Sequence, residues 1–451
     1  MTRENKKDYL IYKLSDEMKR STRIDAELFK KMDVKRGLRN EDGTGVLVGL
    51  TNIGNVVGYE RTTEGKLQPI EGKLYFRGYE VKDLVGAMAR EGRCGFEEII
   101  FLLLSGRLPD SEELQAFKEL IFDNMPLAHQ TILHIIELEG DDIMNILARS
   151  VMEFYTFDPN PDDVSRDNLM RQSIELISKF PTIIAYAFNM YRHKEHGRSL
   201  HIRDAKPGFG IAENFLWMLK GTNYTPLDVR TLDLLLILHS EHGGGNNSTF
   251  TVRVTSSTGT DTYSSIAAGI GSLKGPKHGG ANLKVCDMLS YLKDSVKDWE
   301  NEDEIRTYLR RILAGEVFDK AGLVYGIGHA VYTMSDPRAV LLKEMAGKLA
   351  EEKGRLEELR FMERIERIAI EMVSKAFPGK HFCANVDFYS GFVYDCIGIP
   401  REIYTPLFAM ARIVGWCAHR NEELNFEGRR IIRPAYRCVT DERDYIDIKK
   451  R

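Results

Sequence analysis

The sequence predicts a mainly α-helical protein with a few short β-hairpins near its N-terminus. Helical patterns dominate the chain, whereas strand-like runs are few and confined to the first eighty residues. Strands and long helices do not alternate, as a parallel sheet with crossover helices would require. The pattern therefore favours a predominantly α architecture.

The strand signals come first along the chain, at residues 45–50, 55–60 and 73–79. Each run is rich in apolar or aromatic residues and is bounded by Gly, Asn or charged residues. We expect these runs to form small hairpins, preceded by about forty charged, helix-prone residues.

Helix signals then take over. Asp110 can cap a helix that starts at Ser111, and Glu113 can complete a capping box. Residues 355–377 repeat apolar side chains at spacings of three and four, as an amphipathic helix requires. Residues 232–241 are apolar enough to predict a buried helix.

Length and charge limit the class of protein. With 451 residues the chain can hold a large core and a second lobe. Its 63 basic and 67 acidic residues give a net charge of -4, which argues against general attraction to nucleic acid or to anionic membranes.

No targeting or membrane segment is expected. The chain opens with charged residues, unlike a secretory signal, and the apolar run at 99–104 is far shorter than the ~20 residues that cross a bilayer. The six cysteines show no CxxC pairing, so we interpret them as reduced thiols and expect a cytoplasmic protein.

The densest glycine clusters each touch a histidine. His242 ends the predicted helix 232–241 against Gly243, Gly244 and Gly245, which suit a helix stop. His242 could face a cavity, but a core or capping histidine is the commoner outcome for such a residue. His239 lies on the apolar face and is interpreted as structural.

Two further clusters hold His278 and His329. His278 lies among small residues at 274–282, where main-chain amides could hold an anion, although an ordinary turn has the same pattern. His329 lies in a segment with two glycines at 325–332, which lacks the third glycine of a dinucleotide site. The nearby Arg338 could bind a carboxylate through its planar fork or form a structural ion pair.

The fourth cluster places Asp387 among aromatic and apolar neighbours at 385–391. Such surroundings raise the pKa of a carboxylate and make it a stronger base, although Asp387 could equally be a helix cap. The pattern at 239–242 matches no zinc motif, so no metal is expected.

These four clusters, in this order, closely resemble citrate synthases. The resemblance rests on LHSEHGGGNNSTFTVRV, SSTGTDTYSSIAAGIGSLKGPKHGGAN, GIGHAVYTMSDPRA, NVDFYSGFVY, PLFAMARIVGWCAHRNE and IIRPAYRC, which span at least residues 231–437. The early KLYFRGYEVKDL is also similar to the family.

The resemblance implies a homodimer of nearly all-helical, two-domain subunits. A large domain would comprise residues 1–278 and 393–451, and a small domain, residues 279–392, would close on oxaloacetate. Some bacterial relatives form hexamers with an added N-terminal strand domain. The charged, helix-prone start of this chain favours the plain dimer.

The resemblance also implies residue roles. His278 would bond the thioester carbonyl of acetyl-CoA, Asp387 would remove a methyl proton, and His329 would polarise and protonate the oxaloacetate ketone. The implied oxaloacetate-binding residues are His242, Arg338, Arg412, Phe408 and, from the partner subunit, Arg433. The implied CoA-binding residues are Gly326, Ile327, Gly328, Ala330, Val331, Tyr332 and Asn385.

One position departs from the family. Many relatives carry a basic residue that contacts a CoA phosphate where this chain has Thr333. Acetyl-CoA would be a substrate, so no resident cofactor is expected, and neither nucleic acid nor membrane is an expected partner.

Three alternatives stay open. A 2-methylcitrate synthase would share the fold and catalytic set but accept propionyl-CoA, and one methylene often discriminates by only ~1 to 3 kcal/mol. A catalytically silent scaffold of the same fold would have no chemical need for these residues together. A metal-dependent hydrolase is the remaining alternative.

Overall fold

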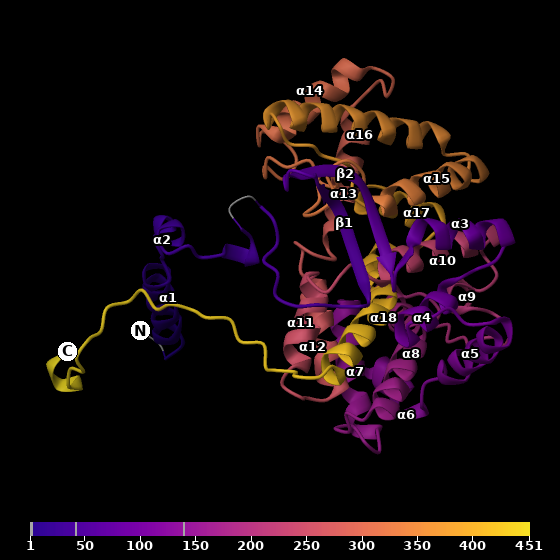
Figure 1. Cartoon of the computed structure of the whole chain (residues 1–451), viewed down its shortest axis with the longest axis horizontal. Coiled ribbons are helices and arrows are strands. Elements are labelled where there is room, and N and C mark those ends of the chain that lie inside the picture. Colours follow the sequence, from indigo (N-terminus) through magenta and orange to yellow (C-terminus); the bar gives the residue numbers. More distant parts are fainter. Residues whose placement is uncertain (1–2, 41–42, 139) are drawn as a thin grey trace. The chain divides into compact units, whose positions relative to one another are not determined.

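The computed structural model describes residues 3–40, 43–138 and 140–451 (Figure 1). Contacts divide the chain into two compact units. The smaller unit combines residues 1–50 with 433–451, and the larger comprises residues 51–432. All of the histidine and aspartate clusters found in the sequence fall in the larger unit.

The smaller unit confirms the helical prediction for the start of the chain and corrects one strand. Residues 45–50 are extended but join no sheet, apart from a single bridge between Gly45 and Arg39. Leu47 and Leu50 are more than four-fifths exposed, because no described neighbouring strand covers them. The helices are α1 (Arg3–Ser21), α2 (Ala26–Lys31), η1 (Arg36–Leu38) and η3 (Ile448–Lys450).

An antiparallel ribbon opens the larger unit. Strands β1 (Gly54–Arg61), β2 (Leu67–Phe76) and β3 (Tyr79–Glu80) pair in the order β1-β2-β3. β1 confirms the strand predicted at 55–60, whereas the run at 73–79 is not one strand but the end of β2, a turn and the start of β3. Arg77 and Gly78 form the two-residue turn between β2 and β3 with φ of 49° and 91°. Positive φ at both positions is what a type I′ hairpin turn needs.

The body of the larger unit is built around α18 (Tyr404–Asn425), which contacts α4, α8, α10, α11 and α12 (Figure 1). Almost every residue of α18 is buried, as in a helix surrounded by other helices. The surrounding elements are α3 (Val81–Glu91), α4 (Phe96–Ser105), α5 (Ser111–Asn124), α6 (His129–Glu137), α7 (Ile143–Phe157), α8 (Arg166–His196), α9 (Ile211–Lys220), α10 (Pro226–Ser240), α11 (Asn247–Ser256), α12 (Thr262–Lys274) and η2 (Arg401–Ile403).

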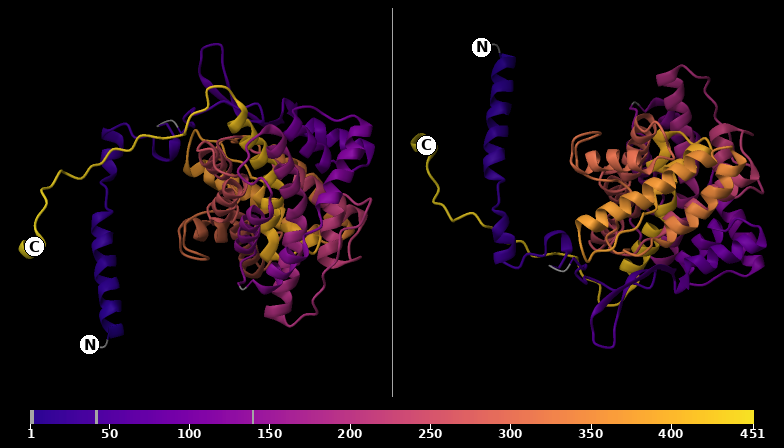
Figure 2. Two further views of the ribbon diagram at one scale, coloured as in Figure 1. Left: turned by 90° about the horizontal axis from the view of Figure 1, so that it is seen from below. Right: turned by 90° about the horizontal axis from the view of Figure 1, so that it is seen from above.

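A second group of helices follows in the chain and forms a separate layer (Figures 1 and 2). Within it α14 packs on α13 and α16, and α15 packs on α16 and α17. Its members are α13 (Ala281–Ser295), α14 (Glu302–Leu313), α15 (Pro337–Glu352), α16 (Leu356–Ala376) and α17 (Asp387–Cys396). They fall almost entirely within the predicted small domain, whose boundaries at 279 and 392 stay a prediction.

The local helix predictions are confirmed. Asp110 caps α5 by accepting a hydrogen bond from the Glu113 amide at 2.9 Å, and the Glu113 side chain completes the capping box. The amphipathic pattern at 355–377 is α16, and α10 ends at Ser240, two residues before His242.

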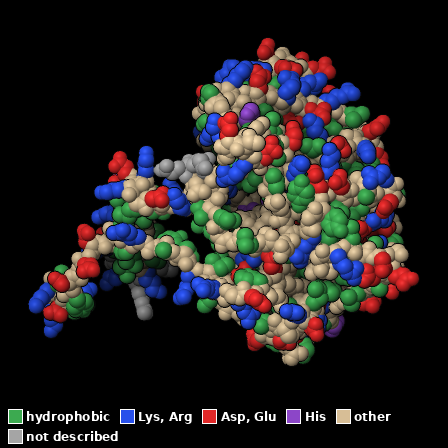
Figure 3. Space-filling view, in the orientation of Figure 1, with side chains coloured by type: hydrophobic (Ala, Val, Ile, Leu, Met, Phe, Trp, Pro, Cys, Tyr) green, Lys and Arg blue, Asp and Glu red, His purple; other side chains and the backbone are tan. Residues whose placement is uncertain are grey.

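The surface of the larger unit mixes both signs of charge. Figure 3 shows acidic and basic side chains interspersed over the visible face. Among the described residues, no helix combines the length and apolar character needed to cross a membrane.

Candidate active site

The site centres on a contact between two histidines from distant parts of the chain. His242 follows the end of α10, where Gly243 turns the backbone with φ of 82°. The Nε2 atom of His242 lies 3.0 Å from Nε2 of His329, which belongs to the loop before α15. The two glycine-rich segments therefore meet.

The loop that carries His329 is fixed against the segment before α17. Gly326 and Gly328 adopt φ of 82° and 99°, values that favour glycine. The Gly328 amide donates to the Cys383 carbonyl at 2.8 Å, and the Asn385 side chain donates to the Gly328 carbonyl at 3.0 Å. These bonds bring His329 and Asp387 into one region.

The proton on His329 is assigned by its neighbours. Its Nδ1 atom accepts the backbone amides of Val331 and Tyr332 at 3.1 and 3.0 Å. Because these amides can only donate, Nδ1 carries no proton, and the proton of the neutral ring is on Nε2. His329 therefore presents an N–H donor at the position where it meets His242.

His242 itself is held neutral. Burial lowers its pKa well below the usual value, and the charges of Arg338 and of neighbouring groups add to this effect. Its Nδ1 atom is buried and has no hydrogen-bond partner among the described residues. The interpretation of His242 as a helix cap is not supported, because Glu241 occupies the C-cap position.

The β1–β2 ribbon packs directly on the His329 loop. A Cβ atom at Gly58 would lie 2.4 Å from the Val331 carbonyl oxygen, and one at Gly72 would lie 2.2 Å from that of Ser335. Only glycine allows this backbone approach. The hydroxyl of Tyr332 also donates to the Lys73 carbonyl at 3.3 Å, so the ribbon supports the loop.

His278 lies in the loop between α12 and α13 and contacts Ser248. The His278 Nε2 atom is 3.0 Å from the Ser248 hydroxyl and accepts the Ser248 amide at 3.4 Å. Burial, reinforced by the charge of Arg412, lowers the pKa of His278 to about 4. The ring is therefore neutral near pH 7, with its proton on Nδ1 because Nε2 is an acceptor.

Asp387 is the first residue of α17 rather than its cap, which is Val386. Its backbone amide donates to the Asn385 side chain at 3.0 Å. Burial raises the pKa of the Asp387 carboxyl to about 6, although the nearby charges of Arg338 and Arg412 oppose the shift. Such a carboxylate is a stronger base than an exposed one.

Arg338 and Arg412, the two buried arginines among the predicted oxaloacetate-binding residues, differ in what they contact. Arg338, at the start of α15, forms a fork with Asp336 through bonds of 3.0 and 2.7 Å. Arg412, on α18, donates from Nε to the His239 carbonyl at 2.7 Å. Its two terminal amino groups are buried without a hydrogen-bond partner among the described residues. They form a fork suited to a carboxylate.

Phe408 connects these groups. Its ring lies 4.5 Å from that of His239, 6.3 Å from that of His278 and 4.8 Å from the Arg412 guanidinium carbon. The His239 ring packs on Phe408, and the His239 main-chain carbonyl accepts the Arg412 hydrogen bond. Both contacts fit the structural role expected for this residue. Burial lowers its pKa to about 3.

The remaining predicted residues occupy different places. Ile327 pairs with Ala384, Tyr332 stacks on His329 with ring centres 4.7 Å apart, and Ala330 is exposed. Arg433 begins the C-terminal segment of the smaller unit and is exposed, and its contribution across a subunit interface stays a prediction. The Thr333 hydroxyl is buried without a hydrogen-bond partner among the described residues.

Sequence reasoning missed three side chains that support the site. Asp336 holds Arg338, Ser248 contacts His278, and Glu241 accepts the Gly243 amide at 2.5 Å. Asp336 could have been found, since an acid two residues before a candidate arginine is a natural partner. The Ser248 contact depends on the packing of α11 and left no local signal.

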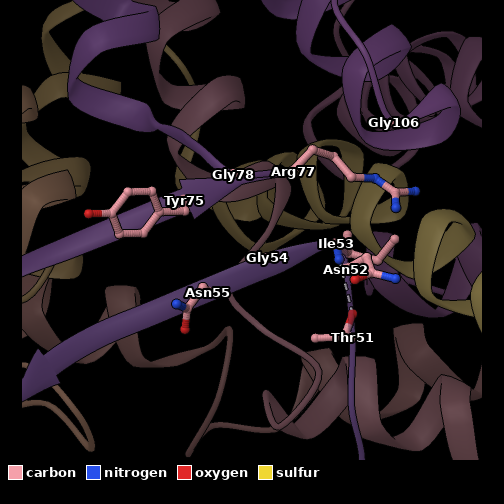
Figure 4. Close-up of a pocket in the computed structure, with 9 residues that line it drawn as sticks. All are labelled: Thr51, Asn52, Ile53, Gly54, Asn55, Tyr75, Arg77, Gly78 and Gly106. Atoms are coloured by element: carbon pink, nitrogen blue, oxygen red, sulfur yellow. Dashed lines mark hydrogen bonds between the residues drawn. The ribbon is translucent and has the colours of Figure 1, made fainter.

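A separate cavity of about 530 Å³ opens at the base of the ribbon (Figure 4). Its lining includes Thr51, Asn52, Tyr75 and Arg77, but none of the predicted site residues. Arg77 donates twice to the Leu103 carbonyl, at 3.1 and 2.8 Å. The histidine site is therefore defined by contacts and burial, not by this cavity.

The fold and site define a mainly helical enzyme with neutral histidines, a basic carboxylate and a buried guanidinium fork. The family model "Citrate synthase, C-terminal domain" matches residues 42–435. The chain belongs to the citrate synthase family.

Individual relatives agree with this assignment. "Citrate synthase 2" of Bacillus subtilis is 34% identical over 89% of this chain and 100% of its own length. A "2-methylcitrate synthase 1" of Corynebacterium glutamicum is 33% identical over 86% of this chain and 95% of its own length. The citrate synthase of Thermoplasma acidophilum, solved as a ternary complex with carboxymethyl coenzyme A and oxaloacetate, has a TM-score of 0.74 and 28% identity, over 93% and 99% of the two chains.

Proposed function

We propose that the chain condenses acetyl-CoA with oxaloacetate and water to give citrate and CoA. The observation that carries this proposal is one buried site that combines Asp387, whose pKa is about 6, with the Arg412 fork, which has no hydrogen-bond partner within the described chain. The first supplies a base for a weakly acidic carbon, and the second binds a carboxylate of the acceptor.

In the first step Asp387 removes a proton from the acetyl methyl group. The electron pair moves onto the thioester oxygen, which accepts the Nδ1 proton of His278 in a hydrogen bond. A neutral imidazole suits this role, since the pKa of His278 is about 4. A preorganised donor of this kind is typically worth about 3 kcal/mol in the transition state.

In the second step the enol carbon attacks the oxaloacetate ketone. The ketone oxygen becomes an alkoxide and takes the Nε2 proton of His329, the tautomer that the Val331 and Tyr332 amides impose. His242, Arg338 and Arg412 orient the two carboxylates. Arginine suits this role because its donors are planar and paired.

In the third step water attacks the citryl thioester carbonyl and gives one proton to His329, which restores its Nε2–H. The carbon–sulfur bond breaks, and the proton held by Asp387 passes to the departing thiolate, so citrate and the CoA thiol leave and both residues return to their starting state. Closure of the predicted small domain on the cleft would keep water from acetyl-CoA until the carbon–carbon bond has formed. Small-angle scattering tests this closure: we expect the radius of gyration to fall when oxaloacetate is added, and an unchanged value would contradict it.

The acyl chain decides between two members of the family. Propionyl-CoA would make the chain a 2-methylcitrate synthase, a name that the Corynebacterium relative carries. Thiol release should be followed from acetyl-CoA and from propionyl-CoA, each with and without oxaloacetate. Faster, oxaloacetate-dependent release from acetyl-CoA supports the proposal, a propionyl preference favours the alternative, and no release at all would support a silent scaffold.

The active form proposed is a homodimer in which Arg433 reaches the partner's site. The smaller unit supports this, because large apolar side chains such as Leu47, Leu50 and Tyr436 are exposed in the single chain. Light scattering should give the mass of two chains, and a stable hexamer would contradict the dimer. A cytoplasmic location is proposed because all six cysteines are free thiols, and cell fractionation tests it.

A further inference from the structure

Two unpartnered groups of opposite charge lie close together beside the site. The Arg412 terminal amino groups and the Glu241 Oε2 atom are buried and have no hydrogen-bond partner among the described residues. A Cβ atom at Gly415 would lie 2.4 Å from Glu241 Oε2 and 3.5 Å from Arg412 Cδ, so both side chains border Gly415. The charge of Glu241 also acts on Arg412, and a carboxylate that reaches a guanidinium can pair with it as a two-bond fork.

Glu241 is held by its other oxygen. Its Oε1 atom accepts the Gly243 amide at 2.5 Å and a hydrogen bond from His419 Nε2 at 2.9 Å. Both Glu241 and His419 are fully buried, and a Cβ atom at Gly54 would lie 2.7 Å from Oε1. The Glu241 carboxylate is therefore fixed by two hydrogen bonds to Oε1, and the close approach of Gly54 leaves it little space to move.

The orientation of His419 is fixed from its far side. Arg253 Nε donates to His419 Nδ1 at 3.1 Å, and since this nitrogen of arginine can only donate, the His419 proton is on Nε2 and points to Glu241. Arg253 is in turn held by Glu423 at 2.6 Å and by Glu422. Glu422 also accepts the Asn52 amide at 2.7 Å, at the wall of the cavity in Figure 4.

We propose that His419 is a positioning residue: it restrains Glu241 so that the Arg412 fork stays open for a substrate carboxylate. The inference rests on the proposed function, in which Arg412 binds oxaloacetate. Without the restraint, the Glu241 side chain would pair with Arg412, and oxaloacetate would have to displace it. Glu241 still helps to keep Arg412 charged, because its negative charge opposes the lowering of the arginine pKa by burial.

The test compares two substitutions of His419 in the full chain. His419→Leu removes both ring nitrogens, and we expect the KM for oxaloacetate to rise about tenfold or more while kcat falls less than about threefold, since a competing ion pair acts on binding. His419→Gln keeps one donor and one acceptor, so its KM should stay within about threefold of wild type. A merely structural role would not produce this separation of KM from kcat.

A double variant identifies the cause. Adding Glu241→Gln to His419→Leu removes the charge that would compete for Arg412, so the KM should return toward the wild-type value. An unchanged KM in His419→Leu, or a KM that stays high in the double variant, would overturn the proposal. If His419→Leu does not fold, His419→Asn replaces it, because its shorter amide cannot span both partners and the same rise is expected.

The thiol-release assay of the wild-type protein distinguishes a failure of this proposal from a failure of the proposed function. If wild type releases no CoA thiol with either acyl-CoA, the function itself fails. Titration calorimetry with oxaloacetate then still tests the restraint, because His419→Leu should weaken oxaloacetate binding about tenfold or more relative to wild type. Equal affinity in wild type and His419→Leu would overturn the restraint in an active or an inactive protein.

Discussion

His242 and His329 share one proton between Nε2 atoms 3.0 Å apart, and the surrounding backbone decides which ring carries it. Two amides donate to His329 Nδ1, so His329 is the donor and His242 the acceptor. A ketone oxygen that accepted this hydrogen bond in place of the His242 nitrogen would find the Nε2–H group of His329 already oriented toward it. The arrangement is a preorganised donor, which needs no reorganisation when charge develops on that oxygen.

The first prediction concerns the charge of His242. Because burial and the Arg338 charge hold its pKa well below the usual value, the ring should stay neutral from pH 6 to 8. Nitrogen NMR of histidine-labelled protein, assigned with a His242→Asn variant, should show no titration of this ring in that range. A midpoint near 6.5 for the His242 signals would contradict the burial argument.

The second prediction concerns Asp387→Asn, which should lower kcat by at least about a hundredfold because the base is removed. The wild-type kcat/KM for acetyl-CoA should also fall about tenfold per pH unit below about pH 6, as the carboxylate becomes protonated.

The same substitution should stabilise the fold. Since the folded pKa of Asp387 lies above the unfolded value, its contribution to stability is full at low pH and is lost as the pH rises through about 6. Asp387→Asn should therefore raise the free energy of unfolding by roughly 2 to 3 kcal/mol at pH 8 and by about half as much at pH 5. Denaturant unfolding at the two pH values measures this, and an equal effect at both would refute the assigned pKa.

The third prediction concerns Arg412→Leu. Removing the fork should raise the KM for oxaloacetate by about a hundredfold or more, while stability changes by less than about 2 kcal/mol because a poorly solvated charge is also removed. Thermal unfolding with and without oxaloacetate separates the two effects. We expect oxaloacetate to raise the Tm of wild type but not of the variant, and an equal rise in both would exclude Arg412 from the site.

The fourth prediction uses two glycines. A Cβ atom at Gly72 meets the Ser335 carbonyl at 2.2 Å, so Gly72→Ala should destabilise the fold by about 1 to 3 kcal/mol and lower kcat by displacing the His329 loop. Gly347, inside α15, has no atom within 4 Å of such a Cβ among the described residues. Gly347→Ala should therefore stabilise the helix by about 0.5 to 1 kcal/mol with unchanged kcat, and similar losses in both variants would refute the steric argument.

The local sequence predicted what depends on neighbouring residues. The capping box of α5, the amphipathic α16 and strand β1 follow from residues a few positions apart, and each was predicted to within a few residues. The run at 73–79 was predicted as one strand, but a turn at Arg77 and Gly78 divides it, and β2 begins earlier, at Leu67. The strand at 45–50 was wrong because a strand needs a partner, and its apolar pattern says nothing about whether one is present.

By itself, the sequence determined the helical class and family of this protein and singled out His242, His278, His329 and Asp387 as candidates. Only the tertiary structure decided which groups meet, which nitrogen of each ring carries the proton, and that Arg338 is paired while the Arg412 fork has no partner in the described chain. The physical reason is that helix and turn signals act over a few residues, whereas pKa values and tautomers depend on burial and on donors brought together from distant segments.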